Sequence, residues 1–341
     1  MIRDLVRSTP PYLLLALACT PTPDRDAPVE AAEYWAQPPA DSVVVGLGQP
    51  VDAAARSREE VWVADGGAAA IFSLSPPEGE YVMLGAADRE PTEIVQPVKL
   101  AVARDIGLAA FDRETERVDL FTFSGEFIRG FSPGFVPAVM GFSRAPLGFT
   151  FGVAVGDSGE DRRTVVIRTD LQGNRPDTLL SPDHGPEALR SAVARRGETA
   201  MSPSDGGMWV WSREAPETVF DLTPRGTRAI TLRPGDRGDI GLLADREREI
   251  LWLVRPESDG ATYMAYDARL AREWTEEPSE SPAAADSADA FLGVRTTGEG
   301  FRPMVIHDGI VMGTRGLGAG LGMAAYDLRV DRLERPEPGD D

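Results

Sequence analysis

Few residues of this chain carry the side chains that most enzymes use for catalysis. The sequence contains one Cys (Cys19), two His (His184 and His307), one Lys (Lys99) and one Asn (Asn174). Sites that need several Cys, His, Lys or Asn side chains are therefore excluded, because the chain has too few of them. No Gly-x-Ser-x-Gly segment is present to place a serine nucleophile beside either histidine. We expect no catalytic set, no bound metal and no cofactor.

Acidic side chains are the remaining candidates for binding a metal ion. Asp65, Asp112, Asp157 and Asp161 each follow an apolar run of the kind that forms a strand. Oxygen-rich clusters can hold Ca²⁺, but this spacing is not that of an EF-hand loop. Asp is also a common turn residue, because its carboxylate accepts hydrogen bonds from nearby backbone N–H groups. We interpret these four aspartates as turn residues.

The N-terminus reads as a targeting segment. Arg3 and Arg7 precede the apolar run 12–17, which is far shorter than the roughly 20 residues of a membrane-spanning helix. Residues 1–18 are therefore predicted to be a signal peptide. The sequence Leu-Ala-Leu-Ala-Cys, ending at Cys19, resembles the lipobox of bacterial lipoproteins, in which the cysteine is lipidated. The resemblance implies an extracytoplasmic protein anchored by lipid at Cys19, with Thr20 favouring the outer membrane.

Composition indicates a globular body between two polar ends. The chain is 42% hydrophobic, which is enough to build a core, and it carries a net charge of −20. Such an acidic surface repels phosphates, so nucleic-acid binding is not expected. Residues 19–42 are rich in Pro, Ala and acidic side chains and are predicted to form a lipidated tether. Residues 334–341 are predicted to be a disordered acidic tail.

Four short strand patterns recur six times in residues 43–333. The second unit is the clearest, with strands predicted at 97–103, 107–111, 118–123 and 126–131, separated by Gly, Asp and Ser turns. In the fifth unit the last strand is predicted at 270–274. We predict an all-β fold, a six-bladed β-propeller of four-stranded antiparallel blades. The apolar run 43–45 is expected to close the ring by pairing in the last blade.

The repeats resemble six-bladed propellers of the broad NHL-like and TolB-like group. In that group Asp-Gly-x-x-Trp-Val often opens a second strand, and Asp205 to Val210 match it. The tryptophans on predicted second strands are expected to pack in the core. Propeller lactonases hold their metal with more than one Asn, whereas Asn174 is alone here. The resemblance therefore implies fold more than function.

Two insertions, 181–198 and 275–302, are interpreted as connections between blades that lie on one rim. The first has a helical pattern, which fits either a structural lid or a docking helix; as a docking helix it is predicted to bind a protein partner through Leu189, Arg190, Val193, Arg195 and Arg196. We therefore expect a non-enzymatic, lipid-anchored scaffold, an extrinsic subunit of a larger membrane assembly. The alternative is a small-molecule hydrolase or lyase with its site in the propeller channel. His307 ends a predicted innermost strand and would line that channel.

Overall fold

A computed structural model describes most of the repeat region and a short N-terminal segment. The described residues are 26–33, 47–75, 80–84, 94–103, 105–144, 147–155, 163–174, 176–193, 199–238, 240–258, 260–274, 287–298, 300–317 and 320–330. The predicted signal peptide, Cys19, the run 43–45 and the acidic tail lie outside them.

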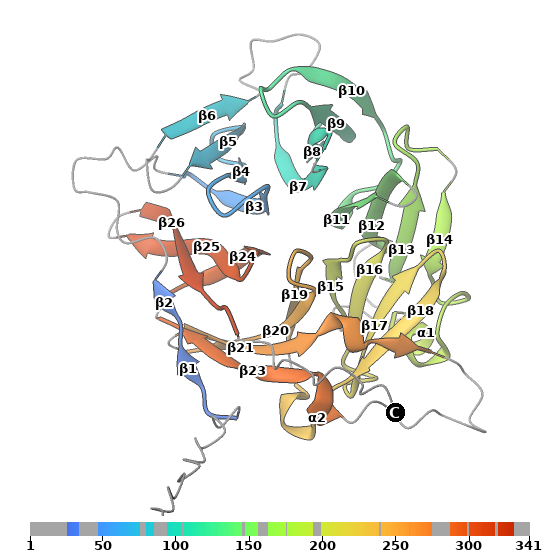
Figure 1. Cartoon of the computed structure of the whole chain (residues 1–341). Coiled ribbons are helices and arrows are strands. Elements are labelled where there is room, and N and C mark those ends of the chain that lie inside the picture. The colour runs from blue at the N-terminus through green and yellow to red at the C-terminus, as the bar shows by residue number, and fades with distance from the viewer. Residues whose placement is uncertain are drawn as a thin grey trace, which may run out of the picture.

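Six small antiparallel sheets stand around a central axis, so the predicted six-bladed propeller is confirmed (Figure 1). The strands of each blade are given from the axis outward. The first blade contains β3 (Pro50–Ala55), β4 (Val61–Asp65), β5 (Ala70–Ser75) and β6 (Glu80–Leu84), and the second contains β7 (Pro97–Ala103), β8 (Gly107–Asp112), β9 (Arg117–Phe121) and β10 (Phe127–Phe131). The third contains β11 (Pro137–Arg144), β12 (Leu147–Val155), β13 (Arg163–Thr169) and β14 (Asp177–Leu180). The next two contain β15 (Thr199–Pro203), β16 (Met208–Ser212), β17 (Thr218–Thr223) and β18 (Gly226–Thr231); and β19 (Gly241–Asp245), β20 (Ile250–Glu257), β21 (Gly260–Asp267) and β23 (Phe291–Thr297). The sixth has β24 (Arg302–His307), β25 (Ile310–Leu317) and β26 (Gly320–Asp327).

The fifth blade differs from its prediction. Its fourth strand is β23, which lies inside the segment that we expected to be an insertion. The predicted strand 270–274 contributes only β22 (Arg272–Glu273), and β22 pairs with β18 of the fourth blade. Phe291–Thr297 contains three apolar side chains and buries Phe291 and Val294, whereas β22 is an exposed Arg-Glu pair. The longer strand therefore has the side chains needed to cover the blade.

The N-terminal segment closes the ring, but through residues that precede the predicted ones. β2 (Ala32–Glu33) pairs with β26 and supplies the fourth strand of the sixth blade. β1 (Val29–Glu30) adds in parallel to β23 on the edge of the fifth blade. Residues 29–33, which we call the strap, were predicted to belong to the tether. In the structure they span two neighbouring blades (Figure 1).

The core lies between blades. The hydrophobic clusters of the described residues each join side chains of adjacent sheets, such as Trp62 with Leu108 and Phe121 between the first and second blades. All four tryptophans of the second strands are at most 3% exposed, as the core interpretation predicted: Trp62, Trp209, Trp211 and Trp252. Burial of side chains of this size contributes roughly 2 to 3 kcal/mol each. Neighbouring blades therefore stabilise one another.

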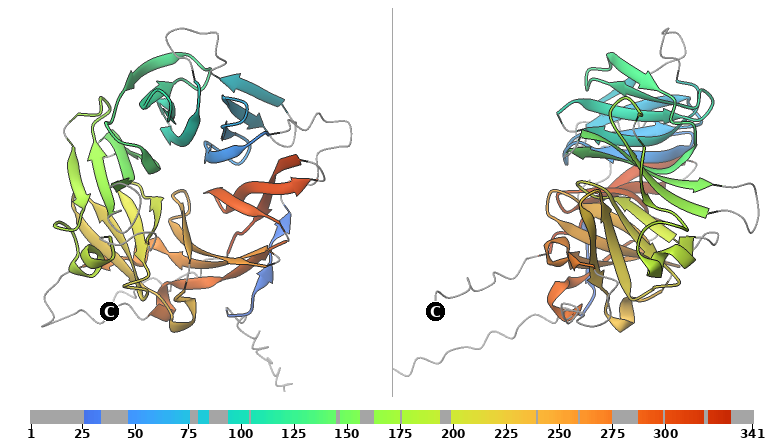
Figure 2. Two further views of the ribbon diagram at one scale, coloured as in Figure 1. Left: turned by 180° about the vertical axis from the view of Figure 1, so that it is seen from behind. Right: turned by 90° about the vertical axis from the view of Figure 1, so that its right-hand side faces the viewer.

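The two rims of the ring carry different loops. Because strands alternate in direction, the connections between blades share a rim with the turns after second strands, and we call this the connection rim. The turns between first and second strands lie on the opposite rim, which we call the hairpin rim. Helix α1 (Glu187–Val193) lies in a connection between blades. Helix α2 (Ser287–Ala290) and the short helix η2 (Ala268–Leu270) lie between a third and a fourth strand. Helices α1 and α2 thus lie on opposite rims, whereas the two insertions that contain them were expected on one rim (Figure 2).

Candidate functional site

A cavity of about 220 Å³ occupies the centre of the ring. Residues of all six innermost strands line it, including Ala53, Leu100, Met140, Met201, Leu243 and Met304. His307, at the end of β24, is also part of the wall, as the sequence suggested. The polar members of the wall are Asp52, Lys99, Ser202, Asp205, Arg246, Glu247 and His307. The propeller channel is therefore mixed in character, with apolar walls and a few charged groups.

Asp52 and Lys99 occupy matching positions in neighbouring blades. Each comes two residues after the proline that opens its innermost strand, and the pairing register shifts between that proline and the charged residue. The same shift occurs before Val139 and Val305 in the third and sixth blades. A bulge of this kind re-aims the side chain that follows it. The first and second blades thus carry charged residues at the position where the third and sixth blades carry valine.

The contact between these two charged groups is loose. Lys99 Nζ lies 3.9 Å from Asp52 Oδ1, beyond hydrogen-bond distance. The Leu100 N–H donates to Asp52 Oδ2 at 2.8 Å, which links the first and second blades. Burial raises the pKa of Asp52, although Lys99 and backbone N–H donors act in the opposite direction. About a quarter of each side chain remains exposed, at 25% for Lys99 and 22% for Asp52.

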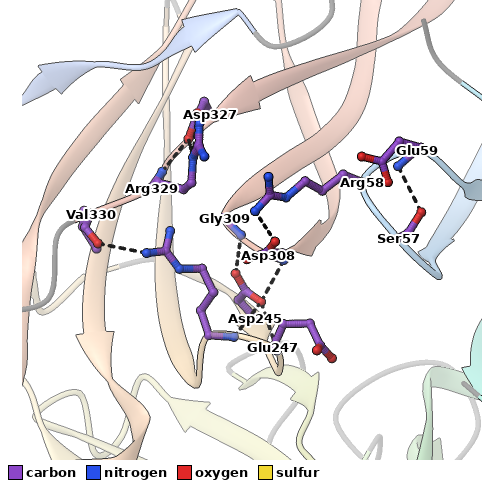
Figure 3. A network of polar contacts seen from close by, with 11 residues as sticks. Ser57, Arg58, Glu59, Asp245, Glu247, Asp308, Gly309, Asp327, Arg329 and Val330 are labelled. Atoms are coloured by element: carbon purple, nitrogen blue, oxygen red, sulfur yellow. Dashed lines mark hydrogen bonds and ion pairs between the residues drawn. The ribbon is translucent and has the colours of Figure 1, made fainter.

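The hairpin-rim mouth of the channel is held together by contacts between blades (Figure 3). Asp245, at the end of β19, accepts hydrogen bonds from Asp308 N at 3.0 Å and Gly309 N at 2.6 Å, and also from two residues of its own turn. Arg58 of the first blade forms an ion pair with Asp308. Asp245 therefore joins the fifth blade to the sixth, and Arg58 joins the sixth to the first.

His307 is the histidine best placed for chemistry, since it lines the cavity. The acid that interacts with it is Asp245, whose pKa is raised by burial and lowered less strongly by backbone N–H donors of Gly309, Arg248 and Asp308 and by His307. Asp245 accepts four backbone hydrogen bonds, three at Oδ1 and one at Oδ2, so its carboxylate is mainly engaged in holding the two turns together. The geometry favours a structural role for Asp245.

The predicted turn role of the aspartates is confirmed where they are described. Asp65 accepts hydrogen bonds from the N–H groups of Gly48, Gln49, Gly67 and Ala68 at 2.6 to 3.0 Å. Asp112 accepts four in the same arrangement, from Val95, Gln96, Glu114 and Thr115. Each carboxylate therefore links two segments of the connection rim through hydrogen bonds. One segment is the connection that leads into the blade, and the other is the turn that follows the second strand of that blade. Asp157 and Asp161 lie outside the described residues.

No group of three His, Cys, Asp or Glu side chains that could hold a metal ion occurs in the described part of the chain. The carboxylates of the cavity wall, Asp52, Asp205 and Glu247, come from three different blades. They line one space without forming a ligand set.

The structure separates the five predicted docking residues. Leu189 and Val193 are fully buried and pack with Val166, Met208 and Phe220 between the third and fourth blades. They hold α1 against the core and are not exposed anchors. Arg190 is partly exposed on the same helix. Arg195 and Arg196 lie outside the described residues, as does Cys19.

Exposed apolar side chains on the connection rim were not anticipated from the sequence. Val95 and Val136 precede the innermost strands of the second and third blades, and Val155 ends the second strand of the third. They are 38%, 42% and 47% exposed. Val136 adjoins Phe135, whose ring contacts Phe151 edge-on. Val95 and Val136 precede the prolines that open their strands, outside the apolar pattern that predicted those strands.

No helix in the described ranges has the length and apolar content needed to cross a membrane.

Comparison with known proteins identifies the fold only. No family model and no curated protein matches the sequence. Among solved structures, a protein of Bacteroides fragilis described as exported is 10% identical, with a TM-score of 0.52 over 89% of this chain and 95% of that one. A virginiamycin B lyase of Staphylococcus aureus is 12% identical, with a TM-score of 0.43 over 81% and 79% of the two chains. The hydrazine synthase of Kuenenia stuttgartiensis is 11% identical, with a TM-score of 0.45 over 86% and 100%.

Proposed function

We propose that this propeller is a non-enzymatic, extracytoplasmic scaffold, held to the membrane by lipid at Cys19, that binds a protein partner through its connection rim. It would act as an extrinsic subunit of a larger membrane assembly. The observation that carries the proposal is the set of exposed valines on that rim, Val95, Val136 and Val155. Each lies on or directly beside a strand of a rigid blade, where binding residues are best positioned.

The route of the chain supports anchoring close to a membrane. Asp26 is already bound to the body, through an ion pair with Arg233. At roughly 3.5 Å per residue, the segment between Cys19 and Asp26 reaches at most about 25 Å. A lipid on Cys19 would therefore keep the propeller near the bilayer. The linker would be shorter than the predicted tether, which extends to residue 42.

The chemistry of the partner follows from charge and exposure. The chain carries a net charge of −20, which accelerates encounter with a basic surface and repels an acidic one. Exposed valines supply the apolar contact that such an encounter needs to persist. We therefore expect a protein partner with an apolar patch bordered by Lys or Arg.

Paired variants test this docking surface. Val136→Glu and Val155→Glu introduce charge on the connection rim, and Leu147→Glu does so in the same blade on the hairpin rim, where Leu147 is 51% exposed. All three should fold, because the side chains are exposed. Affinity capture from detergent-solubilised membranes of the native host, with quantitative mass spectrometry, should show one protein lost with both valine variants and retained with Leu147→Glu. Equal recovery with all variants would contradict the proposal.

A further inference from the structure

We propose that the propeller channel binds a small α-amino acid, whose carboxylate contacts Lys99 and whose ammonium group contacts Asp52. Nothing in this assignment depends on the docking function of the connection rim. None of the three rim valines lines the cavity, and each proposal can be tested without the other.

Lys99 has unused hydrogen-bond donors that face the cavity. Its ammonium group offers three N–H donors. Within the described residues its sole ionic contact is Asp52 at 3.9 Å, and it forms no hydrogen bond. A half-buried ammonium without acceptors is less stable than one that binds an anion. A ligand carboxylate would supply the missing acceptors.

Asp52 offers the complementary group. A carboxylate can accept about four hydrogen bonds. Asp52 Oδ2 takes one from the Leu100 N–H of the neighbouring strand, and Oδ1 faces Lys99 without a hydrogen bond to it. An ammonium group of a ligand would donate to the acceptor sites that remain on this carboxylate.

The spacing of the two charges suits an α-amino acid. In such a molecule the ammonium and carboxylate groups are attached to one carbon, so they lie within about 3 Å of each other. The two protein charges are 3.9 Å apart and of opposite sign. A zwitterion can therefore place each of its charges beside the opposite charge of the pair, while the site remains neutral. A simple anion or a simple cation would satisfy one group and repel the other.

The remaining wall can accept an apolar ligand side chain. Met140 and Phe142 of β11, Met201 of β15 and Met304 of β24 all line the cavity. Methionine adapts its shape to varied apolar groups. The volume of about 220 Å³ is below the range typical of drug-sized ligands, so the ligand should be a small metabolite.

The same contact between Asp52 and Lys99 would be present if the pair served only to join the first and second blades. The structural role and the ligand-binding role predict different responses to an added amino acid. A purely structural pair would make stability depend on Lys99 but would bind no zwitterion. A binding pair discriminates between molecules that differ by one charged group.

Calorimetric titration of the purified full chain with the proteinogenic α-amino acids tests the proposal. We expect one or more to bind with Kd below about 1 mM, corresponding to roughly −4 kcal/mol. Analogues of the best ligand that lack either the ammonium or the carboxylate should bind at least about tenfold more weakly. Lys99→Met and Asp52→Asn should lose at least about tenfold in affinity, and Lys99→Arg should lose less. Arg56→Met is the matched control, since Arg56 forms an exposed ion pair with Glu60 outside the cavity.

A labelling measurement keeps the test valid even if a channel variant unfolds. Lys99 is the only lysine of the chain, so its acetylation is a single event in a mass spectrum. The bound amino acid should slow acetylation of Lys99 in the unmodified protein more than the same concentration of an amino acid that does not bind. The proposal is overturned if no α-amino acid binds the parent protein. Binding that leaves acetylation of Lys99 unchanged, or that is equally strong in Lys99→Met, would also overturn it.

Discussion

Single carboxylates fasten the blades of this propeller at both rims. Asp65 and Asp112 each accept four backbone hydrogen bonds on the connection rim, and Asp245 does so on the hairpin rim. In each case the donors come from two segments that are separated in sequence. Hydrogen bonds to a charged acceptor contribute more than neutral ones, so these aspartates are central to loop order.

Removal of one such carboxylate should destabilise the protein strongly. Asp112→Ala leaves the N–H groups of Val95, Gln96, Glu114 and Thr115 without their acceptor, and we expect a loss of about 3 kcal/mol. Urea unfolding followed by tryptophan fluorescence measures the loss. The matched control is Asp105→Ala, an exposed turn residue of the same blade. Equal stability of the two variants would show that the four hydrogen bonds to Asp112 do not stabilise the fold.

The raised pKa of Asp52 predicts a pH dependence of stability. Burial makes the native state bind the Asp52 proton more tightly than the unfolded chain, for which the pKa is about 3.8. As pH falls from neutrality through the native pKa toward 3.8, the parent should therefore gain stability relative to Asp52→Asn. Melting temperatures of both proteins between pH 7 and pH 4 measure the difference. A difference that is constant with pH, or that falls as the solution is acidified, would contradict the predicted sign.

At the scale of elements, the strap joins the beginning of the described chain to its end. Ala31 lies between β1 and β2, is 6% exposed, and packs in the cluster of the fifth and sixth blades with Trp252, Phe301 and Tyr326. Its N–H donates to the Thr296 carbonyl at 2.8 Å. Arg233, which pairs with Asp26, also lies 3.3 Å above the ring of Phe291. The strap is thus part of the core of two blades.

Two substitutions within the strap should have opposite outcomes. Ala31→Glu places a charge in the core cluster, and we expect it to cost about 3 kcal/mol or more. Val29→Glu changes a side chain that is 50% exposed and should cost less than about 0.5 kcal/mol. Thermal unfolding by circular dichroism measures both. A tolerated Ala31→Glu variant would show that the ring closes without the strap.

The repeat pattern predicted most strands, but it did not identify the outermost strands of the fifth and sixth blades. Strands such as Pro97–Ala103 are long, apolar and bounded by turn residues, so local pattern was sufficient. The fifth blade was misassigned because its fourth strand follows a long intervening segment, and repeat counting chose the nearer Arg272–Glu273. The strap has two-residue strands without an apolar pattern. Its position depends on contacts with β23 and β26, which lie more than 250 residues away in sequence.

Whole-molecule geometry explains why the candidate sites were only partly predictable. The helical pattern of α1 correctly predicted an element, but Leu189 and Val193 face the core, as amphipathic spacing equally allows. The Asp52 and Lys99 pair is formed by residues 47 positions apart that only the ring brings together. The sequence placed His307 in the channel, but it could not show that Lys99 lies beside Asp52 there.

The proposed lipid anchor predicts a simple change in behaviour of the whole protein. Acyl chains on Cys19 would contribute about 0.8 kcal/mol per buried CH₂ group, and several chains together would give durable attachment. Cys19→Ala should therefore move the protein from the membrane fraction to the soluble extracytoplasmic fraction in a host that lacks the partner. Fractionation with immunoblotting measures this. Firm membrane attachment of Cys19→Ala in such a host would contradict lipidation.

The central claim is that the connection rim docks a protein partner, and site-specific photo-crosslinking in the native host tests it most directly. A photoreactive residue at Val136 should form one discrete crosslinked product, because this exposed side chain lies on the proposed docking surface. The same residue at Leu147, which is comparably exposed on the hairpin rim of the same blade, should form none. A product at Leu147 and none at Val136, or the same products at both, would contradict the claim.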